Sequence, residues 1–365
     1  MLRPKRNVQN IAPPAHGGID YAELKRFNIL PDEVIDFSVS VNPFGPPPGI
    51  ESAISRALID RYPDSESTEV REALAKKLKL SPEQIMIGSG STEIIRLIAA
   101  AFFEPSDLVL IPQPTYSEYE TACHLMGARL LKPWMLGEKD LRLNIPRMKE
   151  LIDEHRTSGL FICNPNNPTG EYLAREALNG LLYAAYNSLV VVDEAYVAFA
   201  EDTWDSTELI ETGHLIIVRS MTKDFALPGL RLGYALGSKQ AISALNRVKP
   251  PWNVSSVAQA AAAFVLQNDA YLKTCAAKLR QSGELLVSGL RARGLEPVSS
   301  QANFFLLKVG DAAGFRRALL IKGIIVRDCT SFGLPTYVRL APRTAAECEK
   351  LLTAIDDPEV RSHVS

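Results

Sequence analysis

The chain has 365 residues and a mass of 40.1 kDa, which is enough for one large domain and a smaller one beside it. Its 46% hydrophobic content, formal net charge of -2 and pI near 6.3 exclude a strongly basic surface for nucleic acid or anionic membrane. Five cysteines without C-x-x-C spacing, and a longest apolar run (258–266) too short to span a bilayer, favour a reduced cytoplasmic protein.

The first fifty residues are rich in proline and contain a short helical pattern at 21–27. We expect this segment to lie over another surface rather than to form its own core. From residue 51, helical patterns alternate with short apolar runs, and helices are predicted at 69–80 and 91–103. The apolar runs, which predict strands, are residues 84–87, 108–111, 160–163, 189–192 and 215–218.

Continuous apolar runs are typical of strands buried on both faces, so the predicted architecture is an α/β domain whose mostly parallel sheet is sandwiched by helices. Residues 253–293 predict one long helix, and the last seventy residues predict a small α+β unit. The expected organisation is an N-terminal arm at 1–50 that packs on the small domain and the active site, a large domain at 51–248 and a small C-terminal domain at 249–365.

Polar or turn-forming residues follow each predicted strand, where ligands bind in open α/β sheets. In strand order these segments are GSGSTE at 88–93, PQPTY at 112–116, NPNNPTG at 164–170, DEAY at 193–196 and RSMTKDFALPGLRLGY at 219–234. The first is a small-residue turn that opens a helix, which suits either a phosphate site or a simple tight turn. Tyr116 in the second could stack on a planar cofactor or pack within its loop.

The last two segments carry the charged residues that are candidates for catalysis. Asp193 stands at the end of a buried strand, so it is either a helix cap or ion-pair partner, or the partner of a protonated ring nitrogen. Lys223 is either a solvated turn residue or a nucleophilic amine, and Ser220 with Arg231 could hold a phosphate beside it.

In this order the motifs resemble the fold-type I enzymes that depend on pyridoxal 5'-phosphate, over residues 16–352. Within them the chain is similar to the aminotransferase branch that contains histidinol-phosphate aminotransferases and threonine-phosphate decarboxylases. The resemblance implies that Lys223 forms a Schiff base with the cofactor and that Asp193 keeps the pyridinium nitrogen protonated. It also implies that Asn167 and Tyr196 bind the 3'-oxygen and that Tyr116 stacks on the ring.

The same resemblance implies a phosphate site and a second subunit. The residues expected to hold the cofactor phosphate are Gly90, Ser91, Thr92, Ser220 and Arg231. Tyr62, in DRYPDSES, matches a tyrosine that reaches the partner's phosphate, so a homodimer is expected, with no nucleic-acid or membrane partner.

Several features favour one reaction within this branch. PAHGGID and IDFSVSVNPFGPPPGI resemble segments of the threonine-phosphate decarboxylases, and LPGLRLGY has proline where many histidinol-phosphate aminotransferases have alanine. The substrate contacts implied by the resemblance are His16, Gly17, Ser40, Asn42, Asn167, Arg327 and Arg339. Ser40 replaces the asparagine of the family, and the two arginines suit a substrate with carboxylate and phosphate groups.

The prediction is therefore decarboxylation of L-threonine O-3-phosphate to (R)-1-amino-2-propanol O-2-phosphate for cobalamin synthesis. The alternative is a histidinol-phosphate or related amino-acid aminotransferase. A catalytically silent binding module would need an added helix-turn-helix, which the chain lacks, and a dinucleotide-dependent oxidoreductase would need the third glycine of the fingerprint.

Overall fold

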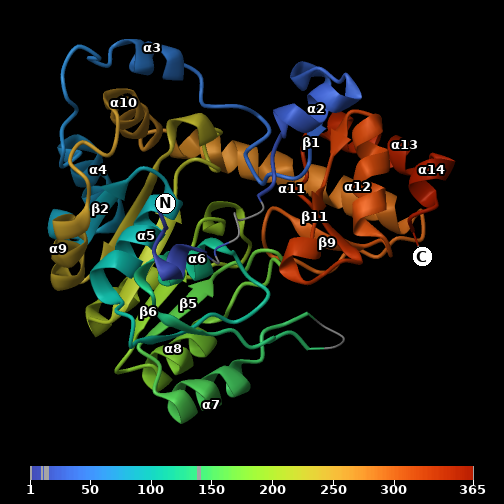
Figure 1. Cartoon of the computed structure of the whole chain (residues 1–365). Coiled ribbons are helices and arrows are strands. Elements are labelled where there is room, and N and C mark those ends of the chain that lie inside the picture. The colour runs from blue at the N-terminus through green and yellow to red at the C-terminus, as the bar shows by residue number, and fades with distance from the viewer. Residues whose placement is uncertain (1, 10, 12–15, 138–140, 365) are drawn as a thin grey trace.

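The computed structural model describes residues 2–9, 11, 16–137 and 141–364. The strands of its large sheet are β2 (Ile85–Gly88), β3 (Leu108–Leu110), β4 (Arg129–Leu131), β5 (Gly159–Cys163), β6 (Leu189–Asp193), β7 (Leu215–Ser220) and β8 (Gly233–Gly237). Within the described residues they form a seven-stranded sheet in the order β2-β8-β7-β6-β5-β3-β4 (Figure 1). Only β8 among these strands runs opposite to its neighbours, which confirms the predicted, mostly parallel sheet.

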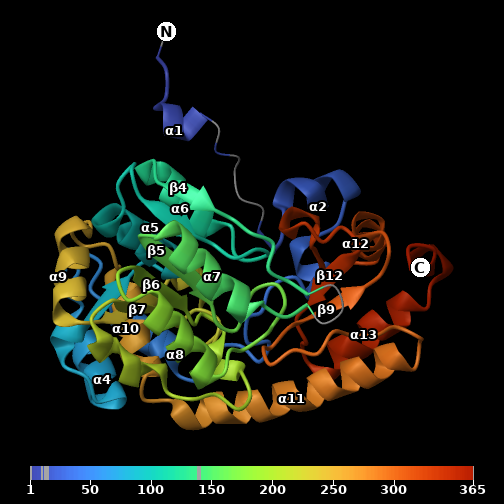
Figure 2. The same ribbon diagram turned by 90° about the horizontal axis from the view of Figure 1, so that it is seen from below.

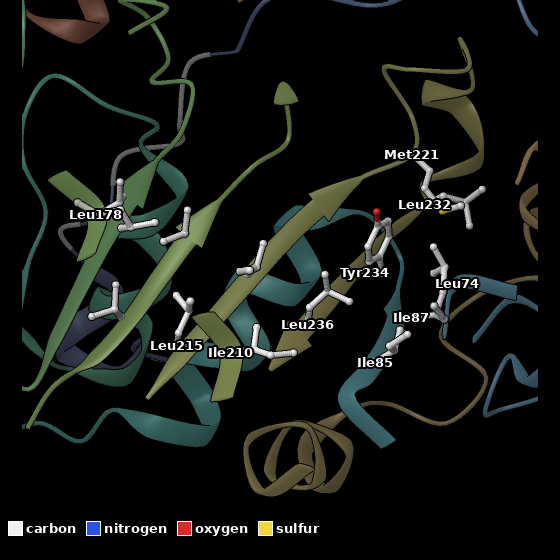
Figure 3. Close-up of a cluster of buried hydrophobic side chains, with 14 of the residues drawn as sticks. Leu74, Ile85, Ile87, Leu178, Ile210, Leu215, Met221, Leu232, Tyr234 and Leu236 are labelled. Atoms are coloured by element: carbon white, nitrogen blue, oxygen red, sulfur yellow. The ribbon is translucent and has the colours of Figure 1, made fainter. Parts of the chain in front are cut away.

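Helices cover both faces of this sheet. They are α3 (Ile50–Ser55), α4 (Thr68–Leu78), α5 (Ser91–Phe102), α6 (Glu118–Met126), α7 (Ile145–His155), α8 (Arg175–Ala184), α9 (Lys239–Val248) and α10 (Ser256–Val265). One core lies between the sheet and α4, α7, α8 and α10, and a second lies between the sheet and α5, α6 and α9. Figure 3 shows part of the first core, where Ile85, Leu215 and Leu236 project from three strands on the same face.

The alternation along the central strands explains these two cores. In β6, Val190 and Val192 enter the first core while Val191 enters the second. Successive side chains of a strand point to opposite faces, so a strand with helices on both sides must be apolar throughout. The sequence gives this apolar character directly, which is why the five predicted strands are confirmed.

The C-terminal part has its own core. Its elements are α11 (Asp269–Arg291), β9 (Phe305–Lys308), α12 (Ala312–Ile321), β10 (Ile324–Ile325), β11 (Arg327–Asp328), β12 (Tyr337–Leu340), α13 (Ala345–Ile355) and α14 (Pro358–Arg361). β9, β11 and β12 form an antiparallel sheet, as expected of a small α+β unit. Figure 2 shows α11 running along the base of the molecule from the large sheet to this part.

The N-terminal segment lies on other surfaces. It contains α1 (Arg6–Gln9), α2 (Tyr21–Phe27) and β1 (Ile35–Asp36). β1 pairs in parallel with β10 of the C-terminal part, and α1 packs against α6 of the large sheet. The expected boundaries of arm, large domain and small domain stay a prediction; in the structure α10 contributes to the core of the large sheet, with Ala258, Ala261 and Ala262.

The prediction of one helix over residues 253–293 is wrong, because the structure has two. α10 ends at Val265 and α11 begins at Asp269. Between them the side chain of Asn268 donates a 2.8 Å hydrogen bond to the Phe264 carbonyl. An asparagine that bonds a nearby backbone group in this way competes with helix continuation.

Among the described helices, none combines the length and the apolar character that a membrane span needs.

Candidate active site

A cavity of about 520 Å³ lies beyond the carboxyl ends of the parallel strands and beside the C-terminal part. The predicted residues that line it are His16, Gly17, Ser40, Ser91, Thr92, Tyr116, Asn167, Asp193, Tyr196, Lys223, Arg231, Arg327 and Arg339. The remaining predicted residues, Gly90, Ser220, Asn42 and Tyr62, are not among the described residues that line it. The structure thus gathers residues from segments more than 300 positions apart in one place.

Lys223 is on the turn that follows β7. Its Nζ lies 4.3 Å from the centroid of the Tyr196 ring, a distance at which an ammonium is attracted by the aromatic face. Phe304, from the C-terminal part, packs edge-on against the Tyr196 ring, with the ring centroids 4.8 Å apart, and so supports it. The amine is therefore held inside the cavity and does not extend into solvent as a turn lysine would.

Asp193 ends β6 and is buried. Its Oδ2 accepts a 2.8 Å hydrogen bond from the Tyr119 hydroxyl, and its Oδ1 accepts one of 3.0 Å from the Ala195 N–H. Burial raises the pKa of the Asp193 carboxyl above its usual value, and the positive charge of Lys223 offsets part of that rise. The described residues place no cation in hydrogen-bond contact with it, so a protonated ligand nitrogen would stabilise its charged form.

The small-residue turn before α5 faces an arginine. Gly90 precedes the helix with φ 84° and ψ 161°, a backbone conformation that is essentially restricted to glycine. A Cβ at this position would stand 2.7 Å from Nη2 of Arg231. Thr92 in the first turn of the helix lies 3.2 Å from the Tyr116 hydroxyl, oxygen to oxygen. Helix N–H groups, hydroxyls and a guanidinium therefore converge, as an anion site requires.

Ser220 lies just behind this group of residues. Its Oγ is 2.8 Å from Oγ1 of Thr222, and Thr222 lines the cavity. Ser220 is therefore connected to the cavity through Thr222, and its predicted contact with the cofactor phosphate stays a prediction.

In the NPNNPTG segment, Asn166 supports the neighbouring loop and Asn167 lines the cavity. Asn166 accepts from the Thr115 hydroxyl at 3.0 Å and donates to the Pro114 carbonyl at 3.1 Å, which ties this loop to the one carrying Tyr116. Asn167 projects into the cavity, where its Oδ1 accepts a hydrogen bond from Arg339. The restrictive sequence thus serves to fix one amide in place.

Two arginines enter from the C-terminal part. Arg339 donates to the Ser38 carbonyl at 2.9 Å, and its Cζ lies 4.8 Å from the centroid of the Phe304 ring. Among the described residues, its buried Nε and the buried Oγ of Ser40 have no hydrogen-bond partner. Arg327 donates to the Ser331 hydroxyl at 2.8 Å. Unsatisfied buried polar atoms beside a cavity indicate a polar ligand.

His16 is held at the rim by a residue that the sequence analysis did not identify. Its Nε2 lies 3.3 Å from Oε1 of Glu118, whose other oxygen accepts from Arg96 at 3.1 Å. The hydrogen bond from His16 and the charge of Arg96 hold the pKa of Glu118 below its usual value. Glu118 is buried and stands two residues after Tyr116 in the sequence. That closeness to Tyr116 was the only sequence feature that could have indicated a place in the site.

Tyr119 and Phe304 were also missed. Tyr119 is three residues after Tyr116, one helical turn, which is a weak signal that both approach the same site. Phe304 lies directly before β9 of the C-terminal part, and nothing in the local sequence connects it with Tyr196. The roles predicted for the individual site residues remain predictions.

Comparison with known proteins agrees with this geometry. Residues 32–355 match the family model described as aminotransferase class I and II. The histidinol-phosphate aminotransferase of Caldicellulosiruptor saccharolyticus is 34% identical over 96% of this chain and 99% of its own length. That of Methanothermobacter thermautotrophicus is 34% identical over 98% of this chain and 97% of its own.

Among solved structures, the L-threonine-O-3-phosphate decarboxylase of Porphyromonas gingivalis is 26% identical, with a TM-score of 0.78 over 88% of this chain and 98% of that chain. The prediction of a threonine-phosphate decarboxylase is nevertheless wrong, because the curated relatives at 34% and 35% identity are histidinol-phosphate aminotransferases. The lyase assignment and the place in cobalamin synthesis lose their support with it. Of the segments that favoured them, His16, Gly17, Ser40, Pro228 and Arg231 line the cavity.

The matched region covers nearly all of the large sheet, the cavity and the C-terminal part, and it contains Asp193, Lys223 and both arginines. The chain therefore belongs to the class I and II aminotransferase family, whose members are pyridoxal 5'-phosphate enzymes of this fold.

Proposed function

We propose that the protein is an aminotransferase that exchanges the amino group of L-histidinol phosphate with 2-oxoglutarate. The observation that carries the proposal is the amine of Lys223, 4.3 Å from the Tyr196 ring, in one cavity with buried Asp193 and two arginines. The 34% identity to histidinol-phosphate aminotransferases over nearly the whole chain supports the choice of substrate.

The residues present fit pyridoxal 5'-phosphate. Asp193 offers a buried carboxylate with a raised pKa, and a protonated ring nitrogen beside it would lower that pKa again. The Gly90 turn with Arg231 offers an anion site. Asn167 and Tyr196 would hold the ring oxygen, and Tyr116 would contact the ring face. When bound, the cofactor supplies an aldehyde for the lysine and an electron sink for the substrate.

The protein's own contribution is to position groups and move protons. Lys223 would hold the cofactor through its Nζ, and the same amine would be placed to take the proton from the substrate Cα. Asp193 would keep the ring nitrogen protonated while electrons leave Cα. Because Asp193 is buried and Lys223 is half-buried beside it, their electrostatic interactions are stronger than they would be in water.

The substrate explains why a proton is removed and CO2 is not. L-Histidinol phosphate carries no carboxylate on Cα, so the C–H bond is the one that Lys223 can address there. Its phosphate would meet the guanidinium groups of Arg327 and Arg339, which suit a tetrahedral anion. The unpartnered Nε of Arg339 and Oγ of Ser40 offer two further donors for the substrate.

The proposal includes a homodimer. Tyr62 is 75% exposed, and its ring stacks on Trp252, with centroids 4.2 Å apart. A tyrosine this exposed can reach a neighbouring subunit, where it would contact the cofactor phosphate. Sedimentation at enzyme-assay concentrations should give a dimer; a monomer that is fully active would contradict this part of the proposal.

The test is a steady-state assay of the purified protein with L-histidinol phosphate and 2-oxoglutarate, following the formation of glutamate. Turnover that disappears in Lys223→Ala supports the proposal. Release of CO2 from O-phospho-L-threonine without turnover of histidinol phosphate would overturn it, as would brisk turnover of other amino donors alone.

A further inference from the structure

Asn42 makes three hydrogen bonds around the turn that carries Lys223. Its N–H donates to the Lys223 carbonyl at 2.9 Å, and its Nδ2 donates to the Asp224 carbonyl at 3.0 Å. Its Oδ1 accepts from the Phe44 N–H at 3.0 Å. The side chain is buried, so these groups compete little with water. The oxygen and one N–H of the side-chain amide are engaged by backbone groups, and Asn42 is not among the described residues that line the cavity.

The Lys223 turn depends on such contacts because it leaves β7 without entering a regular helix. Within the turn, the Leu227 N–H donates to the Thr222 carbonyl at 2.9 Å, but the Ala226 N–H reaches the Lys223 carbonyl only at 3.5 Å. The shorter bond to the Lys223 carbonyl therefore comes from Asn42, 181 positions earlier in the chain. Ala226 also has a positive φ of 54°, which makes the turn costly to hold without external support.

The segment that brings Asn42 to this place is fixed to the C-terminal part. The Phe37 N–H donates to the Ile325 carbonyl at 2.8 Å, and the Ser38 carbonyl accepts from Arg339 at 2.9 Å. The Ser40 carbonyl accepts from Asn303 at 3.3 Å. Residues 37–42 thus form a continuous hydrogen-bonded connection from Arg339 to the backbone of the nucleophile.

We infer that Asn42 is a positioning residue that fixes the Lys223 turn against the segment 37–42. This role replaces the substrate contact expected from the sequence, and it rests on the proposed function in that Lys223 is the reacting amine. A displacement of the amine by a fraction of an ångström is enough to slow a reaction that needs aligned groups. Loss of the hydrogen bonds from Asn42 to the Lys223 turn should therefore slow the formation of the lysine–cofactor bond and lower kcat more than it raises KM.

Asn42→Asp is the closest variant in shape, because it removes the side-chain donor and keeps the size of the side chain, although it also adds a negative charge. The aspartate keeps an oxygen for the Phe44 N–H, but it loses the Nδ2 donor and sets an oxygen against the Asp224 carbonyl. The matched control is Asn268→Asp, which also loses one bond from Nδ2 to a carbonyl, that of Phe264, between α10 and α11. Asn42→Ser, which is uncharged and also loses the bond to Asp224, gives the same comparison if Asn42→Asp does not fold.

The first readout needs no substrate: apoenzyme is mixed with pyridoxal 5'-phosphate, the lysine-linked product is trapped with borohydride, and the Lys223 peptide is quantified by mass spectrometry. We expect capture about tenfold slower in Asn42→Asp and unchanged in Asn268→Asp, with both apoenzymes folded by circular dichroism. In the transaminase assay kcat should fall about tenfold while KM stays within about twofold.

Wild-type rates of capture and turnover in a folded Asn42→Asp would overturn the inference. A rise in KM alone would also overturn it, because that pattern belongs to a substrate contact. If the wild type fails on histidinol phosphate while Asn42→Asp still slows capture, the proposed substrate is wrong and the positioning role stands.

Discussion

The hydroxyl of Tyr119 donates a 2.8 Å hydrogen bond to Oδ2 of Asp193, and both side chains are buried beneath the cavity. Tyr119 is also stacked on Phe161, with ring centroids 5.0 Å apart, so its phenol has little freedom to turn away. The carboxylate that would hold the cofactor nitrogen is thus itself held by a residue of α6. Removal of the Tyr119 hydroxyl alone therefore takes one hydrogen bond directly from Asp193.

Tyr119→Phe should lower the affinity for pyridoxal 5'-phosphate by roughly fivefold, the value of one hydrogen bond of about 1 kcal/mol. Without the phenol the pKa of Asp193 rises further, because a hydrogen bond that favours its charged form is lost. Fluorescence titration of the apoenzyme measures the change. Tyr172→Phe is the control, because it also removes a buried hydroxyl, one that bonds the Trp204 carbonyl; equal affinities in the two variants would contradict the prediction.

Gly90→Ala should weaken cofactor binding by about tenfold or more. The backbone at Gly90 is in a region nearly closed to other residues, which costs about 1–3 kcal/mol, and the new Cβ would displace the Arg231 guanidinium from the anion site. Gly45→Ala is the matched control: its φ is 81°, yet no atom lies within 4 Å of the added Cβ. Both variants should lose stability, but only Gly90→Ala should bind the cofactor weakly, as measured by dialysis against limiting cofactor.

The strand ends could be predicted from the sequence because each apolar run carries its own polar segment directly after it. Asp193 ends β6 and Lys223 follows β7. Parallel neighbouring strands end at the same edge of a sheet, so the sequence alone predicts that these two residues lie close together. β4 and β8 were not predicted, since RLL at 129–131 is short and GYALG at 233–237 has glycine at both ends.

The contacts that were not predicted join parts of the chain that are far apart in sequence. Phe304 contacts Tyr196 only when the C-terminal part packs on the large sheet. Asn42 contacts Lys223 only when residues 37–42 run from the C-terminal part to the Lys223 turn. Neither contact leaves a local pattern. Asn42 was predicted as a site residue by resemblance, but only the structure places its side chain against the backbone behind the nucleophile.

Arg339→Lys should lower kcat/KM for histidinol phosphate by about tenfold to a hundredfold, because charge-assisted hydrogen bonds to an anion contribute about 1.5–3 kcal/mol. Lysine keeps the charge but cannot bond Asn167, the Ser38 carbonyl and a substrate oxygen with one planar group. Arg343→Lys is the control, since Arg343 pairs with Glu347 away from the cavity lining. A loss of the same size in both variants would assign the effect to the fold and not to substrate binding.

Asp224, the residue after Lys223, should make the stability of the apoenzyme depend on pH. Burial raises its pKa from 3.8 to about 7, and the charges of Lys223 and Arg219 limit the rise. Between those two values the folded state binds more protons than the unfolded state, so the contribution of Asp224 to the free energy of unfolding falls as pH increases and levels off above about 7. Asp224→Asn removes this dependence.

The measurement is urea unfolding of the apoenzyme at several pH values between about 5 and about 8. The stability of Asp224→Asn relative to the wild type should rise up to a pH of about 7 and then stay constant, because the desolvated charge that forms in the wild type cannot form in the amide. Asp60→Asn is the control: the hydrogen bond from Arg61 lowers the pKa of the exposed Asp60, so its protonation lies below this range and its relative stability should not change with pH. A flat difference for Asp224→Asn would mean that its carboxylate is already charged and solvated throughout.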